Sequence, residues 1–103
     1  MLNLTPAQKA IVCAIVDAHL PRQRVRVFGS RAGSKAGTAN KPFSDLDLLI
    51  LGAALDSSLR GMLEEAFDES DLPFRVDMVE VAEVANVSPD FLARIQLQAV
   101  ALE

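Results

Sequence analysis

The chain of 103 residues is half apolar, carries a formal net charge of −4, and contains neither tryptophan nor tyrosine. This length allows a single domain, residues 1–103, with a modest core, so we expect a partner chain or a second copy to complete any elaborate substrate pocket. An acidic chain without Trp or Tyr is not typical of a protein that binds nucleic acid directly. Because no leader pattern or apolar run of membrane-spanning length is present, we expect a cytoplasmic protein without a membrane anchor.

The basic residues are distributed unevenly along the chain. No acidic residue occurs between Asp17 and Asp45, whereas six of the ten basic residues lie there. These six are Arg22, Arg24, Arg26, Arg31, Lys35 and Lys41. The cluster indicates either a local anion site or the solvated outer face of a strand.

The first expected element is a helix from Thr5 to about Leu20. Thr5-Pro6-Ala7-Gln8 has the pattern of a capping box with proline at the first helical position. Cys13 lies in the apolar run of this helix, so we expect a core thiol in a reducing compartment. His19 falls at the end of the helix, where the helix dipole alone favours a protonated histidine.

Three strands and two further helices are expected after it. Alternation predicts strands over residues 22–28, 44–51 and 74–81, and helical spacing predicts helices over residues 57–70 and from Pro89 onward. This order predicts an α/β (α+β) fold in which helices pack mainly on one face of a small sheet.

Three aspartates stand within or beside the expected strands. Asp45 and Asp47 share one side of their strand because side chains repeat with period two, and Asp77 lies in the middle of the next strand. If these strands are neighbours, three carboxylates meet and repel one another unless a divalent cation neutralises them. Oxygen ligands favour Mg²⁺ or Mn²⁺, and Mg²⁺ commonly joins carboxylates to substrate phosphates.

The corner formed by Gly29 and Ser30 provides the second half of such a site. Glycine lets the backbone approach a ligand closely, and residues 30–32 are expected to open a short helix whose N–H groups favour phosphate. The sequence therefore predicts phosphoryl chemistry at this corner.

The run GSRA…SDLDLLI followed by VDMVE resembles the minimal nucleotidyltransferases of the DNA polymerase beta superfamily. The resemblance covers nearly the whole chain and implies a single nucleotidyltransferase domain with a small mixed sheet. It also implies Mg²⁺-dependent transfer of a nucleotide, AMP from ATP, to a hydroxyl group with release of pyrophosphate. The most similar members are encoded beside a HEPN-type helical partner, and several are antitoxins that modify that partner.

The resemblance implies a role for each matching position. Asp45 and Asp47 would be catalytic and bind metal ions, while Asp77 would complete one metal site and help to activate the attacking hydroxyl. The nucleotide-binding candidates are Gly29, Ser30, Arg31 and Ser44. The spacer from Arg31 to Ser44 is longer than usual, so Lys35 and Lys41 are not assigned.

Two other functions compete with transfer to a protein partner. One is nucleotide transfer to a small-molecule hydroxyl, although such enzymes usually add a helical acceptor-binding domain. The other is a non-catalytic, nucleotide-binding antitoxin that silences its partner by occlusion.

Overall fold

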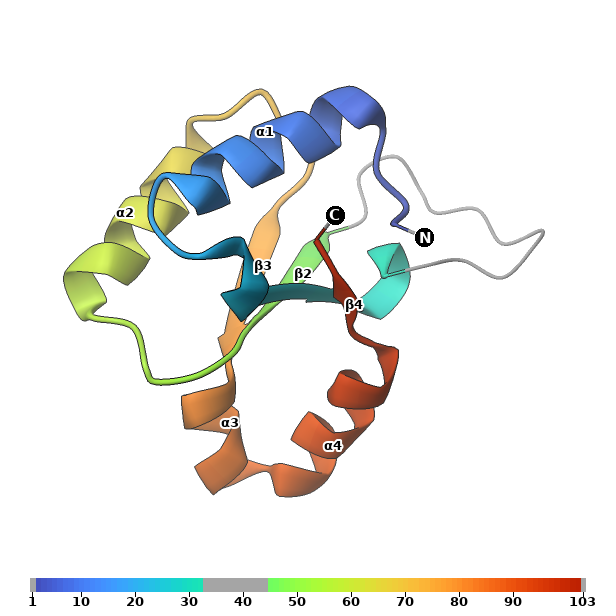
Figure 1. The fold of residues 1–103 in the computed structure, drawn as a ribbon, viewed down its shortest axis with the longest axis vertical. Helices are drawn as coiled ribbons and strands as arrows, with labels where there is room; N and C mark the ends of the chain where they lie inside the picture. The colour runs from blue at the N-terminus through green and yellow to red at the C-terminus, as the bar shows by residue number, and fades with distance from the viewer. Residues whose placement is uncertain (1, 33–44, 103) are drawn as a thin grey trace.

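A computed structural model describes residues 2–32 and 45–102, which form a four-stranded mixed sheet with helices on both faces (Figure 1). The helices are α1 (Pro6–Asp17), α2 (Ser57–Asp68), α3 (Val81–Val87) and α4 (Pro89–Gln98). The strands are β1 (Val25–Phe28), β2 (Leu46–Ile50), β3 (Val76–Glu80) and β4 (Val100–Ala101). Two single 3₁₀ turns, η1 (Arg22–Arg24) and η2 (Gly29–Arg31), flank β1.

The strand order in the sheet is β3-β2-β1-β4. β1 runs antiparallel to β2 and β4, whereas β2 and β3 are parallel. Because β2 lies centrally, its apolar residues are buried on both sides, as is typical of a strand covered by two layers. β3 is an edge strand, so it has a sheet neighbour on one side only.

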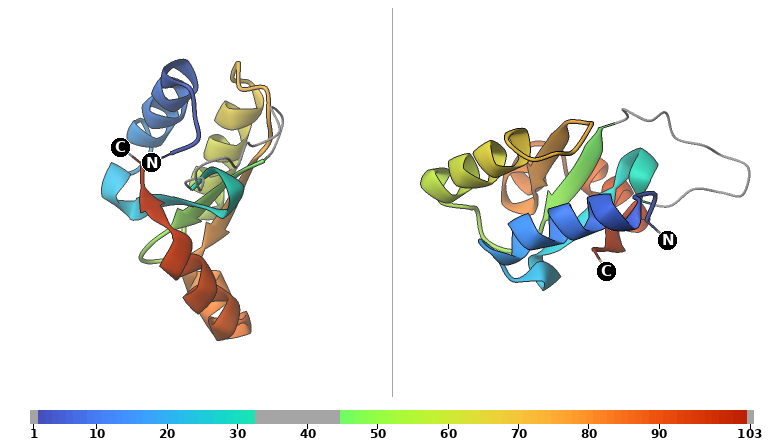
Figure 2. Two further views of the ribbon diagram at one scale, coloured as in Figure 1. Left: turned by 90° about the vertical axis from the view of Figure 1, so that its right-hand side faces the viewer. Right: turned by 90° about the horizontal axis from the view of Figure 1, so that it is seen from above.

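The two faces of the sheet hold separate apolar clusters. Leu46, Leu48 and Ile50 belong to the larger cluster, which includes residues of α1 and α2. Leu49 points to the opposite face and packs with residues of β1 and α4 in the smaller cluster. Figure 2 shows the two helix pairs on either side of the sheet.

The predicted fold class is confirmed, and α1 begins with the expected capping box. Thr5 Oγ1 accepts the Gln8 N–H at 3.1 Å, and Gln8 Oε1 accepts the Thr5 N–H at 3.0 Å. Cys13 is buried in the core, and Nδ1 of His19 lies 2.8 Å from the Ile15 carbonyl oxygen at the end of the helix. None of the helices in the described ranges is long and apolar enough to cross a bilayer.

Several element boundaries differ from those predicted. Residues 22–24 form a turn instead of the start of β1, because the Arg24 N–H bonds to the Pro21 carbonyl and not to a neighbouring strand. α3 and β4 were not predicted: Val81–Val87 is rich in β-branched residues, yet Val81 and Val84 pack as a helix on the smaller cluster. α1 and α2 pack on the larger cluster at one face of the sheet, whereas α3 and α4 pack on the smaller cluster at the other face, so the helices are not confined mainly to one face as expected.

Candidate active site

Two of the three predicted aspartates face each other across neighbouring strands. In the parallel register of β2 and β3, Asp47 is the partner of Asp77. Both lie on the sheet face that carries Leu49 and Val79, opposite α1 and α2. Asp45 precedes Asp47 by two residues and is exposed where the chain enters β2. The structure thus brings the predicted carboxylates to one face of the sheet.

Asp47 carries an electrostatic cost in this position. Burial raises the pKa of Asp47, and the charges of Asp77 and then Asp45 raise that pKa further. In the described part of the chain, no arginine or lysine forms a salt bridge with any of the three carboxylates. The site therefore has an excess of negative charge that a bound cation would relieve.

Gly29 lies directly against the Asp47 carboxylate. Its φ of +73° falls in the left-handed region that favours glycine, and a Cβ added there would collide with Oδ2 of Asp47. Any other residue at this position would displace the carboxylate or the turn. The close approach of backbone to carboxylate is the physical reason for glycine at the end of β1.

The corner that follows is a single 3₁₀ turn over Gly29–Arg31. The Ala32 N–H closes it on the Gly29 carbonyl at 3.1 Å, so the short helix expected from residue 30 amounts to one turn. Ser30 lies within this turn. Ser44, Lys35 and Lys41 lie outside the described residues.

Arg31 is buried, with 4% of its surface exposed. Its guanidinium stacks 4.1 Å from the centre of the Phe74 ring, and Nη1 donates to the Asn3 carbonyl at 2.9 Å. The Asn3 N–H bonds back to the Arg31 carbonyl at 3.0 Å. These contacts tie the N-terminal segment to the turn, and a phosphate contact from Arg31 stays a prediction.

The other described arginines of the basic stretch do not form a shared anion site. Arg22 pairs with Asp17, while Arg24 donates to the carbonyls of Leu51 and Ala53 at 2.8 and 2.6 Å. Arg26 is exposed on β1. Of the described members of this stretch, only Arg31 belongs to the turn beside the carboxylates.

A cleft of about 550 Å³ opens next to Asp47 and Asp77 at the edge of the sheet. Its lining comes from the end of β1, the start of β2, β3 with the residue before it, α2 and α4: Phe28, Asp47, Arg60, Glu64, Asp68, Arg75, Val76, Asp77, Met78, Val79 and Phe91. This volume is in the range of small-molecule sites. Sequence reasoning missed Arg60, Arg75 and Phe91; only Arg75, which lies two residues before Asp77 and directly precedes β3, had a signal in the alternation of side chains over the predicted strand 74–81.

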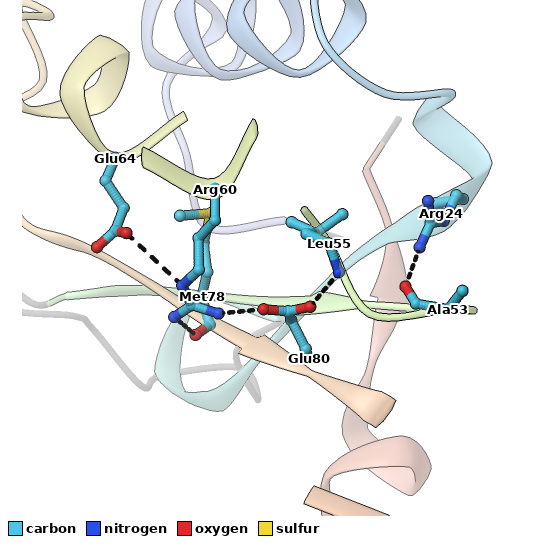
Figure 3. A network of polar contacts seen from close by, with 7 residues as sticks. All are labelled: Arg24, Ala53, Leu55, Arg60, Glu64, Met78 and Glu80. Carbon is cyan, nitrogen blue, oxygen red and sulfur yellow. Dashed lines mark hydrogen bonds and ion pairs between the residues drawn. The ribbon is translucent and has the colours of Figure 1, made fainter. Parts of the chain in front are cut away.

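One wall of this cleft is held by the buried carboxylate of Glu80, which, unlike those of Asp47 and Asp77, is bonded to one of the described arginines (Figure 3). Glu80 accepts the Leu55 N–H at 2.5 Å and Nη1 of Arg60 at 2.6 Å, and Nη2 of Arg60 donates to the Met78 carbonyl at 3.0 Å. Burial alone would raise the pKa of Glu80, but the Leu55 N–H and Arg60 together lower it below its usual value. The network joins α2 and the segment before it to the edge strand that carries Asp77.

The donor set around Asp47 fits a hard divalent cation in an open site. Within the described residues, no three His, Cys, Asp or Glu side chains converge closely enough to enclose an ion. Mg²⁺ commonly binds through one or two carboxylates and completes its shell with water and substrate phosphates. The Asp47 and Asp77 pair, with its uncompensated charge, matches that pattern.

Comparisons with known proteins agree with this geometry. The family described as nucleotidyltransferase domain matches residues 9–99. The probable protein adenylyltransferase MntA of Haemophilus influenzae is 43% identical over 91 residues, which cover 87% of this chain and 74% of that protein. The chain therefore belongs to the nucleotidyltransferase domain family, as an enzyme of the minimal nucleotidyltransferase type in the DNA polymerase beta superfamily.

Proposed function

We propose that this enzyme transfers AMP from ATP to a hydroxyl group of a partner protein, using Mg²⁺ or Mn²⁺ bound by Asp45, Asp47 and Asp77. The observation that supports it most directly is the register of β2 and β3, which sets Asp47 beside Asp77 with Gly29 against the Asp47 carboxylate. A pair of carboxylates next to a close backbone approach suits a ligand that combines a cation with phosphate groups.

Each residue then has a stated task in the reaction. The acceptor oxygen forms a bond to the α-phosphorus of ATP, and the bond between that phosphorus and the oxygen bridging to the β-phosphate breaks. The electron pair of the broken bond leaves with pyrophosphate. Asp77 lies closest to the sheet edge and receives the proton of the attacking hydroxyl, while Gly29, Ser30 and Ser44 position the nucleotide.

The divalent ions, when bound, would polarise the phosphate and stabilise the entering and leaving oxygens. In this proposal Asp47 holds them, and the half-buried position of its carboxylate directly against Gly29 supports that role. Its charge is costly in the absence of a cation and favourable in its presence.

The acceptor in this proposal is a hydroxyl of a HEPN-type helical protein, so that the chain is the antitoxin of a toxin–antitoxin pair. Two observations support a protein acceptor. The relative from H. influenzae is named a probable protein adenylyltransferase. The cleft lies at a sheet edge, where a large acceptor can reach Asp77 without entering a deep cavity.

The test is the intact mass of the HEPN-type neighbour after incubation with the enzyme, Mg²⁺ and each nucleoside triphosphate in turn. We expect one or more adenylyl groups with ATP, none after chelation of the metal, and restoration by Mg²⁺ or Mn²⁺. Asp47→Asn should lower the rate by about 10²–10³-fold or more, because it removes a charge that holds the catalytic ions.

The remaining functions are distinguishable outcomes of that test. Neutralisation of the neighbour that persists in the Asp45→Asn, Asp47→Asn double variant would contradict catalysis and favour occlusion. Modification of a small-molecule hydroxyl in place of the folded neighbour would contradict the protein acceptor while leaving nucleotidyl transfer in place.

A further inference from the structure

A second cleft, of about 270 Å³, lies between the end of β1 and one face of α4. It is lined by Phe28, Gly29, Phe91, Arg94, Ile95 and Gln98. Phe28 and Phe91 also line the larger cleft that contains Asp47 and Asp77, so the two clefts share a wall. The second cleft therefore adjoins the carboxylates on the side where Gly29 approaches Asp47.

The sequence of α4 explains what this cleft contains. Phe91, Arg94 and Gln98 follow at helical spacing and share one face of the helix. Leu92 and Ile95 are buried against the sheet and fix the rotation of α4. That rotation leaves Arg94 and Gln98 exposed beside Gly29.

Arg94 differs from the arginines that hold the fold together. Arg22 and Arg60 pair with carboxylates, and Arg24 donates to backbone carbonyls. In the described part of the chain, Arg94 forms no salt bridge or hydrogen bond. A guanidinium next to the Gly29 corner is thus available for an anionic ligand.

The order of the strands indicates on which side of the site the leaving group departs. Asp77 lies on β3, Asp47 on the central β2, and Gly29 follows β1, so Asp47 stands between the other two. In phosphoryl transfer the attacking and leaving oxygens are roughly in line on opposite sides of the phosphorus. If the acceptor is activated at Asp77, the leaving group departs toward Gly29 and α4.

We propose that α4 extends the phosphate corner at Gly29, with Arg94 binding the β- and γ-phosphates of the donor in the cleft between β1 and α4 and neutralising the pyrophosphate as it leaves. This inference rests on the proposed nucleotidyl transfer. As the bond to the bridging oxygen breaks, negative charge accumulates on pyrophosphate, and a guanidinium can bind two phosphate oxygens at once. The Gln98 amide adds a neutral donor.

The experiment compares two exposed arginines of the same sheet face. Arg94→Gln and Arg26→Gln each remove one positive charge, but Arg26 lies on β1 away from the second cleft. Calorimetric titration with pyrophosphate, ATP and AMP, each in the presence of Mg²⁺, gives their dissociation constants. We expect Arg94→Gln to raise the dissociation constants of pyrophosphate and ATP by about tenfold or more and to leave the dissociation constant of AMP unchanged.

The control variants complete the design. Arg26→Gln should leave all three constants unchanged, and Arg94→Lys should retain part of the pyrophosphate affinity because it keeps the charge but not the planar fork. Pyrophosphate should also inhibit transfer less strongly in Arg94→Gln than in the parent enzyme. Circular dichroism and the melting temperature check that each variant is folded.

Each contrary result has its own meaning. Unchanged pyrophosphate binding in Arg94→Gln overturns the inference. An equal loss of AMP affinity also overturns it, because that result would place the nucleoside in this cleft. An equal loss of pyrophosphate affinity in Arg26→Gln would contradict the inference, because the loss would then come from the change in net charge and not from a specific contact of Arg94. A parent enzyme that binds neither ATP nor pyrophosphate would contradict the proposed function itself.

Discussion

Asp77 and Glu80 are three residues apart on the same edge strand, yet within the described part of the chain only the carboxylate of Glu80 has donors that compensate its charge. Glu80 is 3% exposed and is met by the Leu55 N–H and the Arg60 guanidinium. Asp77 shares its face with Asp47 and Asp45, and the described residues supply no salt bridge to any of them. One carboxylate is compensated by the fold, and the other belongs to a group that is not.

This contrast separates structural charge from functional charge. A buried carboxylate is tolerated when donors satisfy it, as at Glu80, where the pKa is lowered despite burial. At Asp47 burial and like charges raise the pKa, so the folded chain pays for an arrangement that only a cation would relieve. Violations of the usual rules for burying charge are expected at functional sites.

The largest effect on stability should come from neutralising Glu80. Glu80→Gln replaces one acceptor oxygen with an amide that faces the Leu55 N–H or the Arg60 guanidinium, both of them donors. We expect a loss of about 3–5 kcal/mol in the free energy of unfolding, because a buried charge pair loses one partner. Urea denaturation monitored by circular dichroism measures it.

The matched control for this variant is Asp77→Asn on the same strand. It neutralises a carboxylate that no described residue pairs with, so its free energy of unfolding should stay within about 0.5 kcal/mol of the parent or rise. Equal losses of unfolding free energy in the two variants would show that the surroundings of Glu80 and Asp77 do not differ in how well they compensate a carboxylate.

The pH dependence of stability should follow Glu80. Its folded pKa lies below the unfolded value of 4.5, so its contribution is fully present above that value and is lost as the pH falls through the folded pKa. The difference in unfolding free energy between the parent and Glu80→Gln should therefore be constant from pH 7 to about 6 and shrink below about pH 4.5. A difference that grows on acidification would contradict this account.

The carboxylate site could be predicted in part because its signals are local. Period-two alternation places Asp45 and Asp47 on one side of a strand, and aspartate is costly at such positions. That β3 lies next to β2 could only be assumed from the sequence, because the order of strands in a sheet depends on the packing of the whole chain. The observed register of Asp47 with Asp77 supplies that missing step.

The residues around the carboxylates were less predictable because their roles depend on packing between distant segments. Arg31 looked like a cation beside a phosphate corner, yet it is buried against Phe74 and bonded to Asn3. Arg94 had no local signal, because its position beside Gly29 depends on how α4 packs over β1. Such contacts arise from the tertiary fold and leave no trace in spacing.

A smaller effect than that of Glu80→Gln, and of the opposite sign, is a gain in stability on neutralising Asp47. Because the folded pKa of Asp47 is raised above 3.8, its ionisation costs stability at neutral pH, and this cost vanishes as the pH falls below that unfolded value. In a metal-free buffer at pH 7, Asp47→Asn should raise the free energy of unfolding by about 1 kcal/mol, which is a typical gain when a functional residue is removed. Saturating Mg²⁺ or Mn²⁺ should reverse the ranking, because a ligand that binds the folded state stabilises the parent more than the variant. Melting curves of both proteins with and without the metal measure these differences. A variant that is less stable than the metal-free parent, with the same response to the metal, would mean that Asp47 is a structural carboxylate like Glu80.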